Sequence, residues 1–223
     1  MNLYVYGFVT ASKTAAGELT VGGHRIELQT IAGLEVAVER LDERPAISES
    51  ALRRQHAIVT RLARRFDAVL PARFGSLVTL DDLERIVAQR TADLRKALRK
   101  VRGRTQMTLR IVTSPAAVTS VPSVDTPTSG TAYLASRRAA LTGTRPPAAR
   151  ALTRGIGTLL HDERIETTGP GRTSIFHLID SADVREYRAA INGVRLPEGE
   201  RVSVTGPFPA FAFAPAQTAK RRE

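Results

Sequence analysis

Residues 113–129 divide this chain into two parts. The segment reads TSPAAVTSVPSVDTPTS, with three prolines, eight serine or threonine residues and no hydrophobic period, which is typical of a linker or a long exposed loop. Loops of this length are uncommon inside compact domains. We therefore expect two small α+β domains, at 1–112 and 130–214, joined by this linker and followed by a basic tail at 215–223.

The first part opens with strands. The sequence LYVYGFVT, at 3–10, is rich in β-branched and aromatic residues and predicts a buried strand on which Tyr4, Tyr6 and Phe8 share a face. Glycine turns then break 18–41 into further short strands. This order indicates a sheet near the amino terminus.

Two amphipathic helices follow. The first, at 48–66, begins at the N-cap Ser48 and has an apolar stripe with a helical period. This stripe consists of Leu52, His56, Val59, Leu62 and Phe66. The second helix, at 80–102, has Thr79 as its N-cap, acidic residues in its first turn and basic residues in its last turn. A half-buried strand is expected next, at 105–113.

The second part is predicted to run helix, helix, strand, strand, helix, strand. This order does not fit a doubly wound sheet, and it is compatible with a ferredoxin-like arrangement. The elements are expected at 130–142, 146–161, 164–169, 173–180, 182–192 and 201–206.

Several classes of enzyme are excluded or disfavoured. The chain has no cysteine, which removes disulfide scaffolds, thiol catalysis and thiolate zinc sites. Gly155 and Gly157 in RGIGTLL lie inside a predicted helix and lack the rest of a dinucleotide fingerprint. No Walker loop or nucleophile elbow occurs. We expect no catalytic residue, metal, cofactor or small-molecule substrate; an enzyme would need an unrecognised pocket around His56 or Glu166.

Charge and hydropathy bear on location and partners. The start, MNLYVYGFVT, has no secretory pattern, and no apolar run reaches the roughly 18 residues of a membrane span, so we expect a cytoplasmic protein without a membrane partner. The net charge of +11 is concentrated in clusters at 53–65 and 95–104. These clusters are either solvated helix surface or the surface of a nucleic-acid-binding module. Because no recognised nucleic-acid-binding motif is present, that module is the alternative function.

The carboxyl-terminal stretch TGPFPAFAF gathers three phenylalanines. Pro207 and Pro209 cannot donate to a strand ladder, which places Phe208 at a sheet edge or beyond it. Phe211 and Phe213 share a face if the stretch is extended. Exposed without a partner, the three rings would promote aggregation. They therefore either pack on the protein's own domains or contact a partner.

A second short stretch, VLPARFGSL, follows the first helix. Pro71 stops that helix, and Gly75 permits a tight turn toward the second. Arg73 and Phe74 are then expected at a helix–helix junction, where they either hold the junction together or contact a partner.

Four sequence patterns, in this order, resemble the GvpL/GvpF family of gas vesicle proteins. They are YVYGFV at 4–9, the pair His56-Ala57 with VLPARFGSL at 69–77, GTAYLASR at 130–137, and TGPFPAFAF at 205–213. Two positions depart from the family pattern: Phe208 and Ala210 stand where the family often has tryptophan and proline.

This resemblance implies a non-catalytic accessory protein of gas vesicle assembly with two α+β domains, located in the cytoplasm and at the gas vesicle. It implies binding to the hydrophobic shell protein and to other accessory proteins, because exposed apolar subunits aggregate unless they are covered. Within this interpretation, the expected partner-binding residues are Arg61, Arg65, Arg73, Phe74, Phe208, Phe211 and Phe213.

Overall fold

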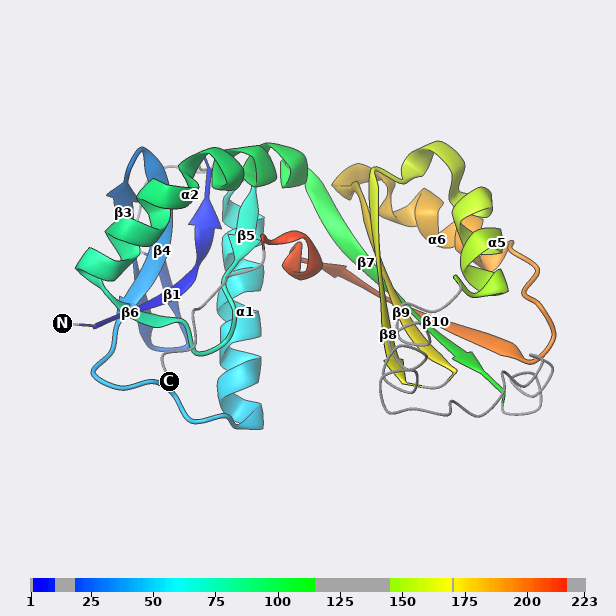
Figure 1. The fold of residues 1–223 in the computed structure, drawn as a ribbon, viewed down its shortest axis with the longest axis horizontal. Helices are drawn as coiled ribbons and strands as arrows, with labels where there is room; N and C mark the ends of the chain where they lie inside the picture. Colours follow the sequence, from blue (N-terminus) through cyan, green and yellow to red (C-terminus); the bar gives the residue numbers. More distant parts are fainter. Residues whose placement is uncertain (1, 11–18, 115–144, 170, 216–223) are drawn as a thin grey trace, which may run out of the picture. The chain divides into compact units, whose positions relative to one another are not determined.

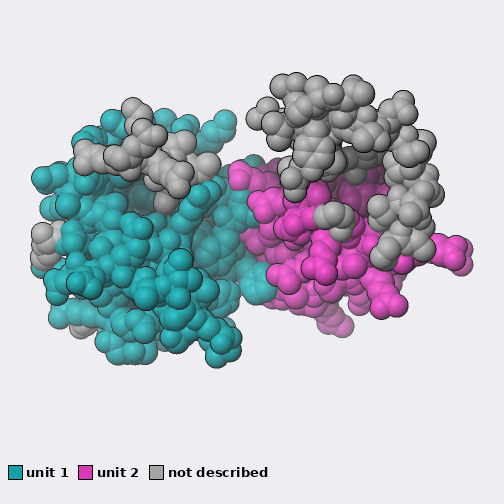
Figure 2. All heavy atoms as spheres, turned by 60° about the horizontal axis from the view of Figure 1, so that its bottom comes forward, with its two compact units in different colours: residues 1–105, 208–223 teal, residues 106–207 magenta. Residues whose placement is uncertain are grey.

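The computed structural model describes residues 2–10, 19–114, 145–169 and 171–215. By their internal contacts the residues form two compact units, which Figure 2 colours separately. Unit 1 comprises residues 1–105 and 208–223, and unit 2 comprises residues 106–207. The predicted linker at 113–129, the helix at 130–142 and the basic tail lie outside the described residues, apart from Thr113, Ser114 and Pro215.

This division differs from the predicted boundary at residue 112. The strand β7 (Arg104–Thr113) was expected to close the first domain, but it pairs within the second sheet. The chain returns to unit 1 at Phe208. Local sequence patterns can indicate a strand, but the sheet that this strand joins depends on its pairing with strands that are distant in the sequence.

Unit 1 contains a mixed-length antiparallel sheet in the order β2-β3-β4-β1-β5, with β6 also paired to β1 (Figure 1). Its elements are β1 (Asn2–Val9), β2 (Leu19–Val21), β3 (His24–Ile31), β4 (Leu34–Arg40), α1 (Glu49–Arg65), β5 (Val69–Pro71), β6 (Leu77–Thr79), α2 (Leu80–Val101) and the 3-10 turn η3 (Phe211–Phe213). The predicted amino-terminal strands are confirmed, and β5 and β6 are two strands that the sequence did not reveal.

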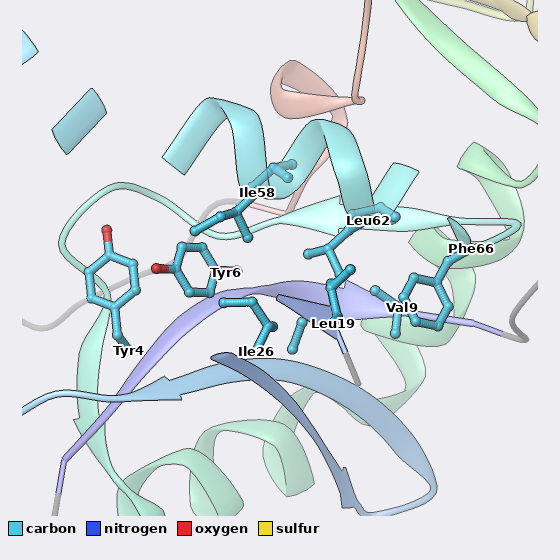
Figure 3. Close-up of a cluster of buried hydrophobic side chains, with 11 residues drawn as sticks. Tyr4, Tyr6, Val9, Leu19, Ile26, Ile58, Leu62 and Phe66 are labelled. Atoms are coloured by element: carbon cyan, nitrogen blue, oxygen red, sulfur yellow. The ribbon is translucent and has the colours of Figure 1, made fainter. Parts of the chain in front are cut away.

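The central strand β1 is buried on both faces because a helix covers each face of the sheet. In Figure 3, α1 lies over the face that carries Tyr4 and Tyr6, and α2 lies beyond the other face. The pairing of β1 with β4 shifts register between Val5 and Gly7. This β-bulge inverts the alternation of side chains, so Phe8 does not share a face with the two tyrosines, contrary to the prediction.

The core between α1 and the sheet is drawn in Figure 3. Its buried members are Tyr4, Tyr6, Val9, Leu19, Ile26, Ala37, Ile58, Val59, Leu62, Phe66 and Val69. The predicted stripe of α1 is confirmed at Val59, Leu62 and Phe66, which are buried. It is wrong at its amino-terminal end, where Leu52 is 46% exposed and His56 is exposed, while Gln55 is buried. Burial of Gln55 is tolerated because its Oε1 accepts from Tyr4 Oη and its Nε2 donates to Ala72 O at 3.0 Å.

Both predicted caps are confirmed. Ser48 Oγ accepts a hydrogen bond from Ala51 N at the start of α1, and Thr79 Oγ1 accepts one from Asp82 N at the start of α2. A side-chain oxygen at this position satisfies one of the free amide groups of the first turn. These caps explain why the predicted and observed starts of the two helices agree.

Unit 2 contains a four-stranded sheet in the order β10-β7-β9-β8. Its further elements are α5 (Pro147–Ile156), the 3-10 turn η1 (Gly157–Leu159), β8 (Asp162–Gly169), β9 (Arg172–Asp180), the 3-10 turn η2 (Ser181–Asp183), α6 (Val184–Asn192) and β10 (Glu200–Phe208). The core lies between this sheet and the two helices, where Met107, Leu109 and Ile111 of β7 meet Leu152 and Tyr187.

The α5 helix ends earlier than the predicted 146–161, because Gly157 adopts a left-handed φ of 51° and stops it. The glycines of RGIGTLL thus have structural roles. A Cβ on Gly155 would lie 2.4 Å from Val194 Cγ2, so this glycine permits close packing against the chain that follows α6. The predicted α+β class is confirmed, and a ferredoxin-like arrangement of the second half stays a prediction.

Candidate partner-binding surfaces

The carboxyl-terminal phenylalanines end in a compact turn and not in an extended segment. Phe211 N donates to Pro209 O at 2.7 Å, and Phe213 N donates to Ala210 O at 3.1 Å. These bonds form η3 and separate the two rings: Phe213 is 3% exposed, whereas Phe211 is 36% exposed. The condition for the two rings to share a face, an extended chain, is not met here, because η3 turns the chain.

The Phe208 and Phe211 rings of this stretch both contact His56 of α1. The Phe208 ring lies edge-on to His56, with ring centroids 5.9 Å apart, and the Phe211 ring stacks on His56 at 6.1 Å and 16° between planes. His56 therefore lies among aromatic rings on the outer side of α1 and does not belong to the apolar stripe. We name His56, Phe208 and Phe211 the aromatic patch of unit 1. Phe208 and Phe213 are packed on the protein, while Phe211 keeps an exposed ring.

Arg73 and Phe74 lie in the loop that joins β5 to β6, not at a helix–helix junction. The loop is held by Tyr4, whose hydroxyl accepts from Gly75 N at 3.0 Å and whose ring lies edge-on to Phe74 at 6.5 Å. Burial raises the pKa of this tyrosine. Gly75 has a φ of 79°, which favours glycine. The Phe74 ring is half-buried and the Arg73 side chain is exposed.

A hollow of about 370 Å³ opens beside this loop, between β1, β6 and α2. Its lining combines apolar side chains with three arginines and is formed by Val5, Phe8, Arg44, Arg73, Phe74, Gly75, Ser76, Leu77, Val78, Leu83, Ile86, Gln89 and Arg90. Val5 points into it by the ordinary alternation of β1, and the β-bulge directs Phe8 to the same side. We call it the arginine-rimmed hollow.

Arg44, Ile86 and Arg90 are among the lining residues that sequence reasoning did not single out. Ile86 and Arg90 are spaced i, i+4 along α2, so they lie on one face of that helix. This i, i+4 spacing was the sequence signal that could have indicated a shared surface for the two residues. Arg44 carries no comparable pattern, because it comes from the loop before α1.

The other predicted residues do not join these surfaces. Arg61 is exposed on α1, and the Arg65 guanidinium lies 6.0 Å from the Phe66 ring centroid. Neither arginine is among the residues that line the hollow. The seven predicted partner-binding residues are thus distributed over several places in unit 1.

The two basic clusters do not form a single surface. The cluster at 53–65 belongs to α1 and most of that at 95–104 belongs to α2, and these helices cover opposite faces of the sheet. Several of the cations also have internal partners: Arg53 pairs with Glu49 at 2.5 Å, and Arg95 donates to Ala32 O at 3.2 Å. This arrangement gives little support to the nucleic-acid alternative, for which a basic patch or stripe on one face is typical.

Unit 2 contains a buried polar network that the sequence did not predict. The fully buried His177 lies 2.7 Å from Tyr187 Oη through Nδ1 and 3.0 Å from Glu163 Oε2 through Nε2. Glu163 also pairs with Arg145 at 2.8 Å and lies 2.9 Å from the Thr153 hydroxyl. Burial acts to raise the pKa of Glu163, but the bonds from His177 and Thr153 and the charge of Arg145 outweigh it and lower that pKa.

His56 and Glu166 are the two residues around which the sequence analysis placed the pocket of a possible enzyme. His56 lies between phenylalanine rings, and Glu166 is exposed on β8. Within the described part of the chain, no group of three or more His, Asp or Glu side chains is arranged to hold a metal ion. Also within that part, no helix is both long and apolar enough to cross a membrane.

Comparisons with known proteins identify the family. The family model described as gas vesicle synthesis protein GvpL/GvpF matches residues 2–215. A search of the curated proteins found no match.

Two solved structures have the same fold. The gas vesicle protein GvpF from Microcystis aeruginosa is 14% identical, with a TM-score of 0.73 over 96% of this chain and 99% of that chain. The gas vesicle protein GvpF from Anabaena sp. PCC7120 is 15% identical, with a TM-score of 0.69 over 96% of this chain and 98% of that chain. Since the family model spans nearly all of the sequence, this chain belongs to the GvpL/GvpF family of gas vesicle synthesis proteins.

Proposed function

We propose that this chain is a non-catalytic assembly factor that binds the hydrophobic shell protein and other accessory proteins of the gas vesicle. It acts in the cytoplasm, where it covers apolar shell subunits before they join the vesicle wall. Membership of the GvpL/GvpF family, over residues 2–215, is the observation that carries this proposal.

The surface of unit 1 supports a binding role. Phe211 presents an exposed ring at the aromatic patch, and Ile86 presents an exposed side chain, 39% accessible, at the arginine-rimmed hollow. Exposed apolar groups mark binding surfaces where they gather with other apolar groups, as Phe211 does with Phe208 around His56 and Ile86 does in the hollow. They are suited to a partner whose own apolar surface would otherwise aggregate.

The positions of the titratable groups support a role without catalysis. His177 and Glu163 bond to each other, and Tyr187 completes the contacts of the imidazole in the interior of unit 2. His56 packs against two aromatic rings. These side chains have partners that account for their placement as structural groups.

Co-expression with the shell protein tests the proposal. We expect the full chain to co-purify with the shell protein and to increase its soluble fraction. Phe211→Ser should weaken both effects, whereas Ile165→Ser is a matched control: Ile165 is a large apolar residue of almost equal exposure, 37%, on β8 in unit 2. Absence of co-purification, together with unchanged shell aggregation, would refute the proposed function.

A further inference from the structure

The arginine-rimmed hollow combines an apolar floor with an unbalanced positive rim. Apolar side chains come from β1, β6 and α2, whereas Arg44, Arg73 and Arg90 supply three positive charges. None of its lining residues is acidic. A volume of about 370 Å³ falls within the range of about 300–1,000 Å³ that binding pockets usually have.

The three rim arginines differ from other arginines of the chain in their partners. Arg40, Arg85 and Arg145 each pair with a carboxylate. Arg44, Arg73 and Arg90 have no such ion pair among the residues that the structure describes. Their guanidinium groups are thus available to carboxylates of a ligand, and an arginine fork suits that group well.

The chain's own terminal residues are a poor occupant of this hollow. The described chain ends at Pro215, which lines a small adjoining hollow together with Phe8, Ile86 and Arg90. The eight residues that follow in the sequence, AQTAKRRE, carry three basic side chains and one acidic side chain. Like charges would oppose their entry beside the three rim arginines.

A second copy of the chain is disfavoured for the same electrostatic reason. The net charge of the chain is +11, so two copies repel each other at long range. The charge of the rim instead complements a segment whose polar side chains are carboxylates. Its apolar floor complements the apolar face of an amphipathic segment, as in other helix-in-groove complexes.

We propose that the arginine-rimmed hollow is a docking site for an acidic amphipathic segment of a partner protein. Apolar side chains of that segment fill the hollow beside Phe8, Phe74 and Ile86, and its carboxylates pair with Arg73, Arg90 and Arg44. This inference rests on the proposed function only in taking the occupant to be a protein.

Two displayed peptide libraries test the docking site with the purified full chain. Both libraries have Leu, Ile, Val or Phe at helical spacing; the polar positions are Glu in one library and Lys in the other. We expect the chain to enrich the Glu library over the Lys library by about tenfold or more, from two or three partly exposed arginine–carboxylate pairs. Arg73→Glu with Arg90→Glu should abolish or reverse this preference.

A matched double variant controls for the overall charge. Lys96→Glu with Arg99→Glu makes the same charge change on exposed positions of α2, away from the lining of the hollow, and should retain the preference for Glu. Ile86→Glu tests the apolar floor: because Ile86 is exposed, this change should leave the fold intact while reducing enrichment of the Glu library. Far-UV circular dichroism checks the fold of each variant.

Three results would overturn the docking site. They are equal enrichment of the two libraries, enrichment of neither library, and a Glu preference that survives Arg73→Glu with Arg90→Glu. Because this assay contains neither the shell protein nor another accessory protein, its failure leaves the proposed assembly function standing. Conversely, library binding without shell-protein binding supports the docking site and removes the proposed function.

Discussion

Glu163→Gln in unit 2 is a sharp test of the buried network. The wild-type carboxylate uses Oε2 toward His177 Nε2 at 3.0 Å, and it pairs with Arg145 at 2.8 Å through Oε1. An ionised carboxylate only accepts hydrogen bonds, so both neighbours donate to it. The amide has the same shape, but it removes the charge and places an NH2 group among these donors.

The expected loss of stability in Glu163→Gln follows from the contacts that the carboxylate makes in the wild type. Hydrogen bonds to charged groups contribute about 1.5–3 kcal/mol each. In the variant, the amide oxygen still accepts one hydrogen bond, now without a negative charge. The ion pair with Arg145 is lost. We therefore expect Glu163→Gln to lower the free energy of unfolding of unit 2 by about 2–4 kcal/mol near neutral pH.

The pH dependence has a definite sign. The pKa of Glu163 is lower in the folded protein than its ordinary value, so its ionised form stabilises the fold. This contribution is fully present above the unfolded pKa of about 4.3 and is lost as the pH falls through the folded pKa. The stability difference between wild type and Glu163→Gln should therefore shrink below about pH 4.

Hydrogen exchange of the β8 and β9 amides measures this difference, because those strands report on unit 2 alone. Glu166→Gln is the matched control: it makes the same change at an exposed position of β8 and should shift stability by less than about 0.5 kcal/mol. The reasoning fails if Glu163→Gln costs no more than this control, or if its cost is the same at low and neutral pH.

Further substitutions test close packing and capping. Gly7→Ala should destabilise unit 1 by about 1–3 kcal/mol, because its Cβ would lie 2.6 Å from Leu70 O; urea unfolding followed by far-UV circular dichroism measures this. Gly155→Ala should cost about 1–3 kcal/mol in unit 2 by overpacking, and Val194→Ala should restore part of that loss in the double variant. Ser48→Ala should lower the stability of unit 1 by about 1 kcal/mol, since it removes the N-cap of α1.

Each of these predictions has its own contradicting result. Gly169→Ala is the control for the two glycine variants, because a Cβ at that position meets nothing within 4 Å. Losses no larger than that of the control would contradict the packing argument. For the cap, Ser48→Asp should retain stability, and equal losses from alanine and aspartate would contradict it.

Sequence reasoning was most accurate where a structure depends on neighbouring residues. The starts of α1 and α2 were predicted from Ser48 and Thr79, since a cap acts within a single helical turn. The strands β8 and β9 were also expected, at 164–169 and 173–180, and they pair with each other. These features need no information about distant parts of the chain.

The candidate surfaces could be predicted only in part. Arg73 and Phe74 were singled out from the sequence and both line the hollow, but the sequence did not predict a hollow, whose lining also includes Phe8. Phe8 points there because the β1 bulge inverts the side-chain alternation, and nothing in the local pattern indicated that bulge. Their role in partner binding stays a prediction.

The amino-acid sequence by itself determined the α+β class, the helix caps and the family of this protein. The tertiary structure decided that Gln55, not Leu52, is buried, that β7 joins the second sheet, and that His56 meets Phe208 and Phe211. The physical reason is the sequence separation over which each interaction acts. Caps and periodicity act over a few residues, whereas register, burial and ring contacts arise from segments up to 155 positions apart, as between His56 and Phe211.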